Sequence, residues 1–275
     1  MVISQKAAAT TLQIAKADMI EGMARGMAVL ECFDTQRQRL NATLAAERAG
    51  ITRAAARRHL LTLTYLGYLE TDGSYFWLSA KVLRFSGSYL ATARLPRAVQ
   101  PTLNRLAAQV QQSFSVAVLD GDEVVIIGRS GFEGRIPGDD KPLAPRLLAY
   151  GLHLGARLPA HATSTGRVLL AAQAKGVFAQ WLKGRPLARL TTHTVTEPRQ
   201  FRSLIEQVRV NDFSLAVEEH ELGVQALAVP LRNMQGSTVA ALNLVASNQR
   251  LSALAMRQDM LPLLLDAARE LRPLL

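Results

Sequence analysis

The sequence predicts an α+β protein, with a small helical domain at its N-terminus and a larger domain built around an antiparallel sheet. The length of 275 residues exceeds the usual size of one domain. Short helical patterns and one tight hairpin fill the first 79 residues, and longer strand patterns follow only after residue 112. Because helices flank those strands without alternating with them, the pattern excludes repeated βαβ units.

The composition excludes several classes of protein. Apolar residues make up 49% and charged residues 20%, which is ordinary for a globular protein and excludes a disordered chain. Cys32 is the only cysteine, so the chain has no intrachain disulfide, Cys-rich zinc module or CxxC pair, and a reducing cytoplasm fits. The sequence has no eighteen-residue apolar run and no signal peptide pattern. We therefore expect a soluble, cytoplasmic protein that does not use a membrane.

The charge is strongly positive, with 32 Lys and Arg against 22 Asp and Glu and a net charge of +10. Both the first 92 residues and the remainder are basic. An excess of positive charge suits a polyanion such as nucleic acid, because neutralised phosphates release counterions. A plain solvated surface explains the same charge, so charge alone assigns no function.

The first two helices are predicted before residue 51. Apolar residues recur at helical spacing over 20–33, and a polar gap follows. Asn41 is a favourable N-cap for a short helix over 42–49. Gly50 ends this helix, because glycine readily adopts the left-handed conformation found after a last turn.

The third helix and a hairpin complete the N-terminal domain. Thr52 is the predicted cap of a helix over 53–66, which ends at Gly67. Asp72 and Gly73 then form the strongest short hairpin signal, between two apolar and aromatic runs. Two short helices joined by a glycine-containing turn, followed by a hairpin, predict a winged helix-turn-helix. The predicted buried stripe of the third helix is Ala56, Leu60 and Leu63.

A connecting helix follows from Ser79, its predicted cap, over 80–93. We expect its apolar face to pack against a partner subunit or the next domain. Pro96 and Pro101 mark a boundary near residue 95. The predicted apolar face consists of Val82, Phe85, Tyr89 and Ala93.

The larger domain is predicted from mixed helical and strand patterns. A long loop over 131–145 is rich in glycine, proline and charge. The expected elements are a helix over 102–112, a hairpin over 113–129, helices over 161–172 and 197–212, strands over 213–219, 224–231 and 237–246, and a closing helix from Ser252. The expected parts of the chain are an extension 1–19, the winged helix-turn-helix 20–79, a dimerising linker helix 80–95 and a second domain 96–275.

The third helix carries the residue types that read DNA. Arg53 and Arg57 lie one turn apart, and Arg58 adjoins them. Recognition helices contact bases through their N-terminal residues, and an arginine can make two hydrogen bonds to guanine. Ala54 keeps the helix narrow near the groove floor, and Thr52 can reach a phosphate.

Arg48, at the end of the preceding helix, is placed near the DNA backbone if that helix crosses it. The arginines could instead only solvate the outer face of the helix, but the turn and the wing favour DNA binding. One helix reads too few base pairs to be selective, so we expect a homodimer on two half-sites about 34 Å apart, or a multiple of this. The linker helix is the candidate for holding the dimer.

A second candidate site lies where Thr163, Ser164 and Thr165 open an apolar helix. Free backbone amides, hydroxyls and the positive end of the helix dipole favour a bound carboxylate there. The same residues would equally serve as an ordinary helix cap. Arg129, at the end of a predicted strand, is either a charged partner for the anion or a surface residue.

No catalytic motif is complete. The segment ATSTG is not the GxSxG elbow, and EEHELG lacks the second histidine of an HExxH zinc site. Glu218 and Glu219 are neighbours on a predicted strand, so their side chains point to opposite faces. We expect no catalytic residue, metal ion or cofactor. Packing or surface roles are expected for His153, His161, His193 and His220.

Six segments in this order resemble an IclR-family transcriptional regulator from about residue 21 to the C-terminus. Within the family, three segments are similar to the PobR-type branch of activators that respond to 4-hydroxybenzoate. The family segments are ARGMAVLECF, LNATLAAERAGITRAAARRHLLTLTYLGYL, FWLSAKVLRFSGSYL, RLPAHATSTGRVLLA, EEHELGVQALAVP and VAALNLVAS. The branch segments are DTQRQRLNAT, YFWLSAKVLRFSGSYL and YGLHLGARLPAHATSTG.

The resemblance implies a GAF-like effector-binding domain after the linker helix. Its pocket would be formed partly by the amides of Ser164 and Thr165. Some relatives that bind small keto acids have polar groups where this chain has Ala216 and Ala226, which suggests a roomier, more apolar pocket suited to a benzene ring. The other pocket positions implied by the resemblance are Tyr150, Leu158 and Asn243.

The implied function is a regulator of aromatic acid catabolism that binds promoter DNA and responds to 4-hydroxybenzoate, with 3-hydroxybenzoate or protocatechuate as alternative effectors. An activator would also contact RNA polymerase, and the working unit would be a homodimer or a dimer of dimers. An enzyme acting on a small acid, with the helix-turn-helix as an accessory module, is a less favoured alternative. A nonspecific DNA binder would leave the second domain without a role.

Overall fold

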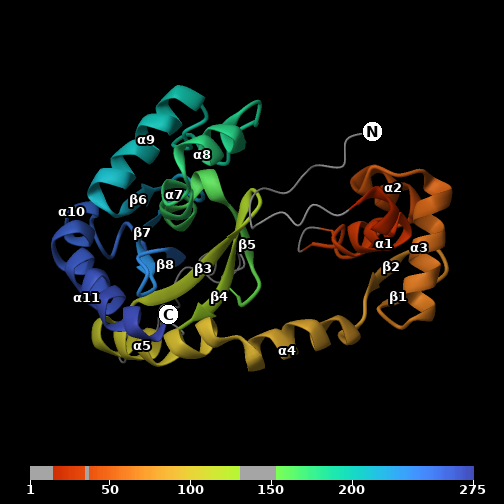
Figure 1. Cartoon of the computed structure of the whole chain (residues 1–275), viewed down its shortest axis with the longest axis horizontal. Coiled ribbons are helices and arrows are strands. Elements are labelled where there is room, and N and C mark those ends of the chain that lie inside the picture. The colour runs from red at the N-terminus through yellow and green to blue at the C-terminus, as the bar shows by residue number, and fades with distance from the viewer. Residues whose placement is uncertain (1–14, 35–36, 131–152) are drawn as a thin grey trace. The chain divides into compact units, whose positions relative to one another are not determined.

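The computed structural model describes residues 15–34, 37–130 and 153–275 (Figure 1). The chain forms two compact units, Thr10–Thr92 and Ala93–Leu275. Most of the N-terminal extension, the expected loop over 131–145 and Tyr150 lie outside the described residues. In the described part of the chain, no helix has the length and apolar character needed to cross a membrane.

The N-terminal unit has the predicted helices, and the second and third are capped by the residues that the sequence indicated. The side chain of Asn41 accepts hydrogen bonds from the amides of Thr43 and Leu44, and Gly50 ends the second helix with a left-handed φ of 64°. Thr52 Oγ1 accepts from the Ala55 amide at 3.2 Å and so begins the third helix. The three helices are α1 Glu21–Leu30, α2 Ala42–Ala49 and α3 Arg53–Tyr65.

The wing is the short antiparallel pair β1 (Leu69–Thr71) and β2 (Phe76–Leu78). In its turn, the Asp72 side chain accepts from the amides of Ser74 and Tyr75, and Gly73 takes a φ of 95° that favours glycine. The predicted stripe of α3 is confirmed as the centre of the small core, with Ala56, Leu60 and Leu63 all buried.

The linker begins as predicted at Ser79, whose hydroxyl accepts from the Lys81 amide. A short 3-10 turn, η2 Ala80–Val82, leads into α4 Leu83–Thr92. The Phe85 ring stacks on Tyr68 with centroids 5.6 Å apart, yet Phe85 keeps 61% of its surface exposed in the single chain.

The next helix, α5 Arg94–Val110, corrects the expected start at residue 102. Pro96 falls in its first turn, where backbone amides have no helical partner, so proline costs little there. Pro101 lies inside the helix and removes one hydrogen bond. Burial of Val99 and Leu103 against the sheet offsets that loss.

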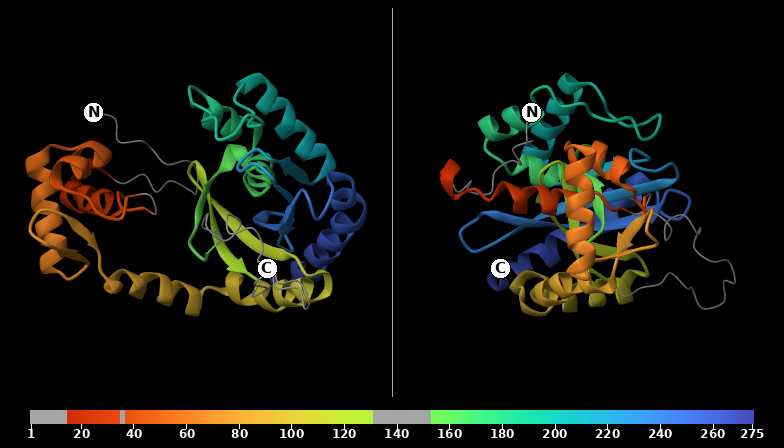
Figure 2. Two further views of the ribbon diagram at one scale, coloured as in Figure 1. Left: turned by 180° about the vertical axis from the view of Figure 1, so that it is seen from behind. Right: turned by 90° about the vertical axis from the view of Figure 1, so that its right-hand side faces the viewer.

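The C-terminal unit is built on a six-stranded antiparallel sheet in the order β5-β4-β3-β8-β7-β6, which confirms the α+β architecture (Figure 2). The long pairing of β7 with β8 is joined by the predicted turn at 233–236. The strands are β3 Ser113–Asp120, β4 Glu123–Arg129, β5 Arg157–Pro159, β6 Ser214–Val217, β7 Val224–Arg232 and β8 Thr238–Ser247.

Helices cover both faces of this sheet (Figure 1). One face packs on α5 and on α11 Leu261–Leu271, and the opposite face packs on α7 Ser164–Ala171 and α9 Pro198–Asn211. The patterns did not predict β5 or α8 Lys175–Leu182. The expected closing helix is divided into α10 Ala253–Ala255, the π-helical turn η4 Met256–Met260 and α11.

Candidate functional site

The outer face of α3 carries the arginines expected to contact DNA. Arg53, Arg57 and Arg58 are exposed, and so are Thr52 and Ala54 at the start of the helix. Within the described residues, none of the three arginines has an acidic ion-pair partner. Their charges therefore remain available to a polyanion.

Two further arginines brace the same unit. Arg48, at the end of α2, forms an ion pair with Asp34, so a contact with the DNA backbone would compete with that carboxylate. Arg39 forms an ion pair with Asp72 at the wing turn and lies over the Trp77 ring, 4.7 Å from its centroid. These contacts of Arg39 stabilise the conformation of the wing.

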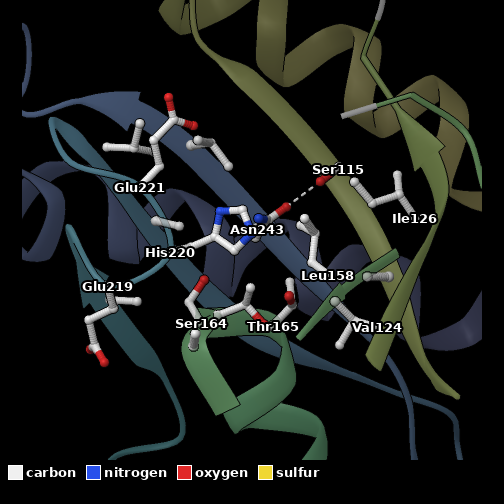
Figure 3. Close-up of a pocket in the computed structure, with 17 residues that line it drawn as sticks. Ser115, Val124, Ile126, Leu158, Ser164, Thr165, Glu219, His220, Glu221 and Asn243 are labelled. Atoms are coloured by element: carbon white, nitrogen blue, oxygen red, sulfur yellow. Dashed lines mark hydrogen bonds between the residues drawn. The ribbon is translucent and has the colours of Figure 1, made fainter. Parts of the chain in front are cut away.

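A pocket opens between the sheet and the N-terminal end of α7 (Figure 3). The pocket has an empty volume of about 690 Å³, which includes the solvent-filled space at its open mouth. The strand residues at its floor alternate with residues that face α5, because successive strand residues point to opposite faces of a sheet. The pocket therefore lies on the α7 side, beside the core of that face.

The start of α7 supplies unused hydrogen-bonding groups to this pocket. Thr163 Oγ1 accepts from the Gly166 amide at 3.2 Å, and the Arg167 amide bonds to the Thr163 carbonyl, which leaves the amides of Ser164 and Thr165 without a partner in the helix. Ser164 is fully buried, and its hydroxyl has no hydrogen-bond partner in the described part of the chain. A buried hydroxyl that lines a cavity beside two free amides fits a bound anion.

Gly166 fixes the position of this helix. A Cβ atom on Gly166 would lie 2.1 Å from the carbonyl oxygen of Ala160, closer than any real contact. We therefore expect Gly166→Ala to displace the start of α7 and to destabilise the domain by about 1 to 3 kcal/mol. Chemical denaturation measures this cost, and Gly176→Ala, where nothing lies within 4 Å, is the matched control. Equal stability of the two variants would contradict the prediction.

The structure brings most of the expected pocket residues together. Ser164 and Thr165 lie at the helix start, and Asn243 lies on the central strand β8 (Figure 3). Arg129, at the end of β4, is not among the described lining residues, although it pairs across the sheet with Ser115, which does line the pocket. Tyr150 lies outside the described residues. The expected residues that line the pocket are Leu158, Ser164, Thr165, Ala216, Ala226 and Asn243.

Sequence reasoning missed the central polar residue of the pocket. His220, expected in a packing or surface role, points its ring into the pocket, toward Ser164 and Asn243 (Figure 3). Burial lowers the pKa of His220, and the nearby His161 lowers it further, so the ring is neutral at neutral pH. Thr163, which the sequence placed at the same helix start, also lines the pocket. The other missed lining residues are Ser115, Ala117, Val124, Ile126, Ala162, Glu219, Glu221, Val224 and Val245.

Asn243 is oriented by a second missed residue. The Ser115 hydroxyl, on the neighbouring strand β3, donates to the side-chain oxygen of Asn243. The amide nitrogen of Asn243 then remains available as a donor inside the pocket. The only signal in the sequence is the alternation of the two strands, which does not say which residues pair.

A buried ion pair holds the helix against the segment that carries His220. Arg167 is 2% exposed, and its guanidinium bonds to both carboxylate oxygens of Glu219. Glu218 faces elsewhere: its carboxylate accepts from the Gly223 amide and lies 3.8 Å from His193. The neighbouring glutamates thus have different partners, but not through strand alternation: β6 ends at Val217, and Glu218 takes a left-handed φ of 56° in the bend that follows.

A winged helix-turn-helix with free arginines and a separate domain with an anion-compatible pocket define the class of ligand-sensing DNA-binding regulators. Residues 22–73 match the IclR helix-turn-helix domain, and residues 87–272 match the bacterial transcriptional regulator IclR C-terminal domain. The chain belongs to the IclR family of transcriptional regulators.

Two relatives in Acinetobacter baylyi match nearly the whole chain. The Pca operon regulatory protein is 50% identical and covers 94% of this chain and 90% of its own length. The p-hydroxybenzoate hydroxylase transcriptional activator is 49% identical and covers 95% of this chain and 94% of its own length.

Two solved structures contain benzoate derivatives. The inducer-binding domain of a double mutant of Acinetobacter PobR, in complex with 3-hydroxybenzoic acid, is 44% identical with a TM-score of 0.58 and covers 66% of this chain and 98% of that one. An IclR homolog from Microbacterium hydrocarbonoxydans, complexed with 4-hydroxybenzoate, is 26% identical with a TM-score of 0.66 and covers 91% and 97%.

Proposed function

We propose that the protein is a cytoplasmic transcriptional activator of aromatic acid catabolism that binds 4-hydroxybenzoate in the pocket at α7. The observation that carries this proposal is the buried Ser164 hydroxyl, which has no partner among the described residues, beside two amides left without a partner in the helix. The rest of the described cavity lining is largely aliphatic. The relatives support the same effector class, because one activates a p-hydroxybenzoate hydroxylase gene and a related structure holds 4-hydroxybenzoate.

The carboxylate would bind at the start of α7, where Ser164 and Thr165 offer donors. The ring would lie among the aliphatic side chains on the sheet side, including Val124, Ile126 and Leu158, and its hydroxyl would bond to Asn243. The ligand has about ten non-hydrogen atoms, and at about 0.8 kcal/mol for each the Kd is micromolar.

Calorimetric titration of 4-hydroxybenzoate tests this proposal. We expect a micromolar Kd for the wild-type protein and a loss of about 10-fold to 100-fold for Ser164→Ala, which removes one hydrogen bond to a charged group. The unliganded variant is expected to keep its melting temperature, because the wild-type hydroxyl has no hydrogen bond to lose among the residues that the structure describes. Absence of heat at millimolar ligand would reject 4-hydroxybenzoate as the effector. Tighter binding of 3-hydroxybenzoate or protocatechuate would identify that acid as the effector instead.

The proposed partners are promoter DNA, a second copy of the chain and, for an activator, RNA polymerase. Leu83, Phe85 and Tyr89 leave an apolar face on α4 that is 65%, 61% and 48% exposed in the single chain. Burying this face between two copies would place two recognition helices on two half-sites. The dimers would pair further where four half-sites are occupied. The pocket would bind its ligand without transforming it, since the relatives are regulators.

A further inference from the structure

The pocket lacks a fixed positive charge among its described lining residues. The lining contains no lysine or arginine, and its titratable members are Glu219, His220 and Glu221. The buried guanidinium of Arg167, next to the lining residue Glu219, is committed to that carboxylate through two hydrogen bonds. Neutral donors at a helix start favour an anion, but they do not cancel its charge.

We propose that His220 is the group that neutralises the bound carboxylate, and that it takes up a proton from solvent as the acid binds. The inference rests on the proposed function, because it assigns a role at the same site. The His220 ring lies in the pocket between Ser164 and Asn243, next to the helix start where the carboxylate would bind (Figure 3). A proton on this ring would convert a neutral contact into a charge-assisted one.

The segment that carries His220 is held in place on both sides. The backbone carbonyl of Glu219 accepts from the Thr194 hydroxyl at 2.6 Å, and the Glu218 amide donates to the Val224 carbonyl at 2.7 Å. Because these bonds do not involve the imidazole, His220 can change its charge without a change in its backbone support.

The charges around His220 determine whether its pKa rises or falls when a carboxylate binds. The charge of Glu219 is compensated by Arg167 of α7. His161 lies in the turn before α7, and burial lowers its pKa, so it is neutral. The Glu221 carboxylate points away from the His220 ring (Figure 3). Burial and His161 keep the pKa of His220 below its ordinary value in the free protein. An adjacent carboxylate raises the pKa of that ring, because an opposite charge favours the charged form.

Proton uptake by His220 makes the affinity for the carboxylate depend on pH. The complex binds more protons than the free protein at any pH between the free and the bound pKa of His220. Affinity is therefore highest at low pH and falls as the pH rises through this window, by at most about tenfold per pH unit. The ligand carboxyl does not contribute, because an ordinary carboxylic acid is ionised above about pH 6.

Calorimetry in buffers of different ionisation enthalpy measures the proton directly. At pH 7 we expect the apparent enthalpy of 4-hydroxybenzoate binding to rise linearly with the buffer ionisation enthalpy, with a slope between zero and about one proton taken up. His220→Gln, which cannot be protonated, is expected to bind more weakly and with zero slope. His153→Gln, an exposed histidine outside the pocket, is the matched control and should keep the wild-type slope.

The uncharged 4-hydroxybenzyl alcohol is a second ligand for the same calorimetric experiment. Any binding of this alcohol to wild-type protein should occur without proton uptake. Zero slope for 4-hydroxybenzoate on wild-type protein, or an unchanged slope in His220→Gln, overturns the inference while leaving the proposed effector intact. A complete lack of 4-hydroxybenzoate binding overturns the proposed function itself. Zero slope on the wild-type protein overturns the inference whether or not the variant folds.

Discussion

Replacing Arg57 with alanine is expected to weaken binding to a specific operator by about 2 to 6 kcal/mol, because a dimer loses one contact with a guanine in each half-site. This energy corresponds to roughly 30-fold to 10⁴-fold in Kd. The exposed position of Arg57 on α3, without an acidic partner in the described residues, means that the substitution removes no bond that the fold uses. The same loss is expected for Arg53→Ala.

Fluorescence anisotropy on a duplex selected by the wild-type protein from a random pool measures this effect. A scrambled duplex separates base reading from attraction to phosphates, because loss of a base contact weakens only the specific complex. Arg58→Ala is expected to weaken both complexes equally and to reduce the salt dependence by about one phosphate contact per half-site. Arg202→Ala, an exposed arginine of the other unit, is the charge-matched control. An equal effect of Arg57→Ala and Arg202→Ala would refute the role of α3.

The second large effect is expected in the effector-binding domain. Arg167→Met leaves the Glu219 carboxylate buried without its partner, and we expect a loss of about 3 to 5 kcal/mol in the free energy of unfolding. The double substitution Arg167→Met with Glu219→Leu replaces the pair by apolar side chains of similar volume and should recover most of this stability. The loss therefore measures an uncompensated charge more than the value of the pair.

Urea unfolding followed by Trp181, a buried tryptophan of this domain, tests the prediction in a Trp77→Phe background. Arg105→Met is the control, because Arg105 and Glu270 form an exposed ion pair worth less than about 1 kcal/mol. If Arg167→Met costs no more than Arg105→Met, the buried pair does not hold α7 to the segment that carries His220.

Features encoded within a few residues are the ones that the sequence predicted well. The caps at Asn41 and Thr52, the left-handed Gly50 and the Asp72-Gly73 turn depend on hydrogen bonds and backbone angles within one turn of chain. The opening of α7 by Thr163 belongs to the same group. Such interactions join residues that are close in the sequence, so reading the sequence is enough to locate them.

Long-range packing accounts for the errors. Helix α5 continues through Pro101 because the burial of its apolar face against the sheet outweighs one lost hydrogen bond. The short strand β5 exists only through its pairing with β4.

Local hydrogen bonds and hydrophobic periodicity encode the two-domain order, the arginines of the third helix and the helix start at Ser164, so the sequence was sufficient to predict them. Three features became visible only in the folded chain: His220 enters the pocket, Ser115 orients Asn243, and Arg167 is bound to Glu219. Each of these contacts joins residues from separate elements. Strand register and helix packing set their geometry, and neither is written in a short stretch of sequence.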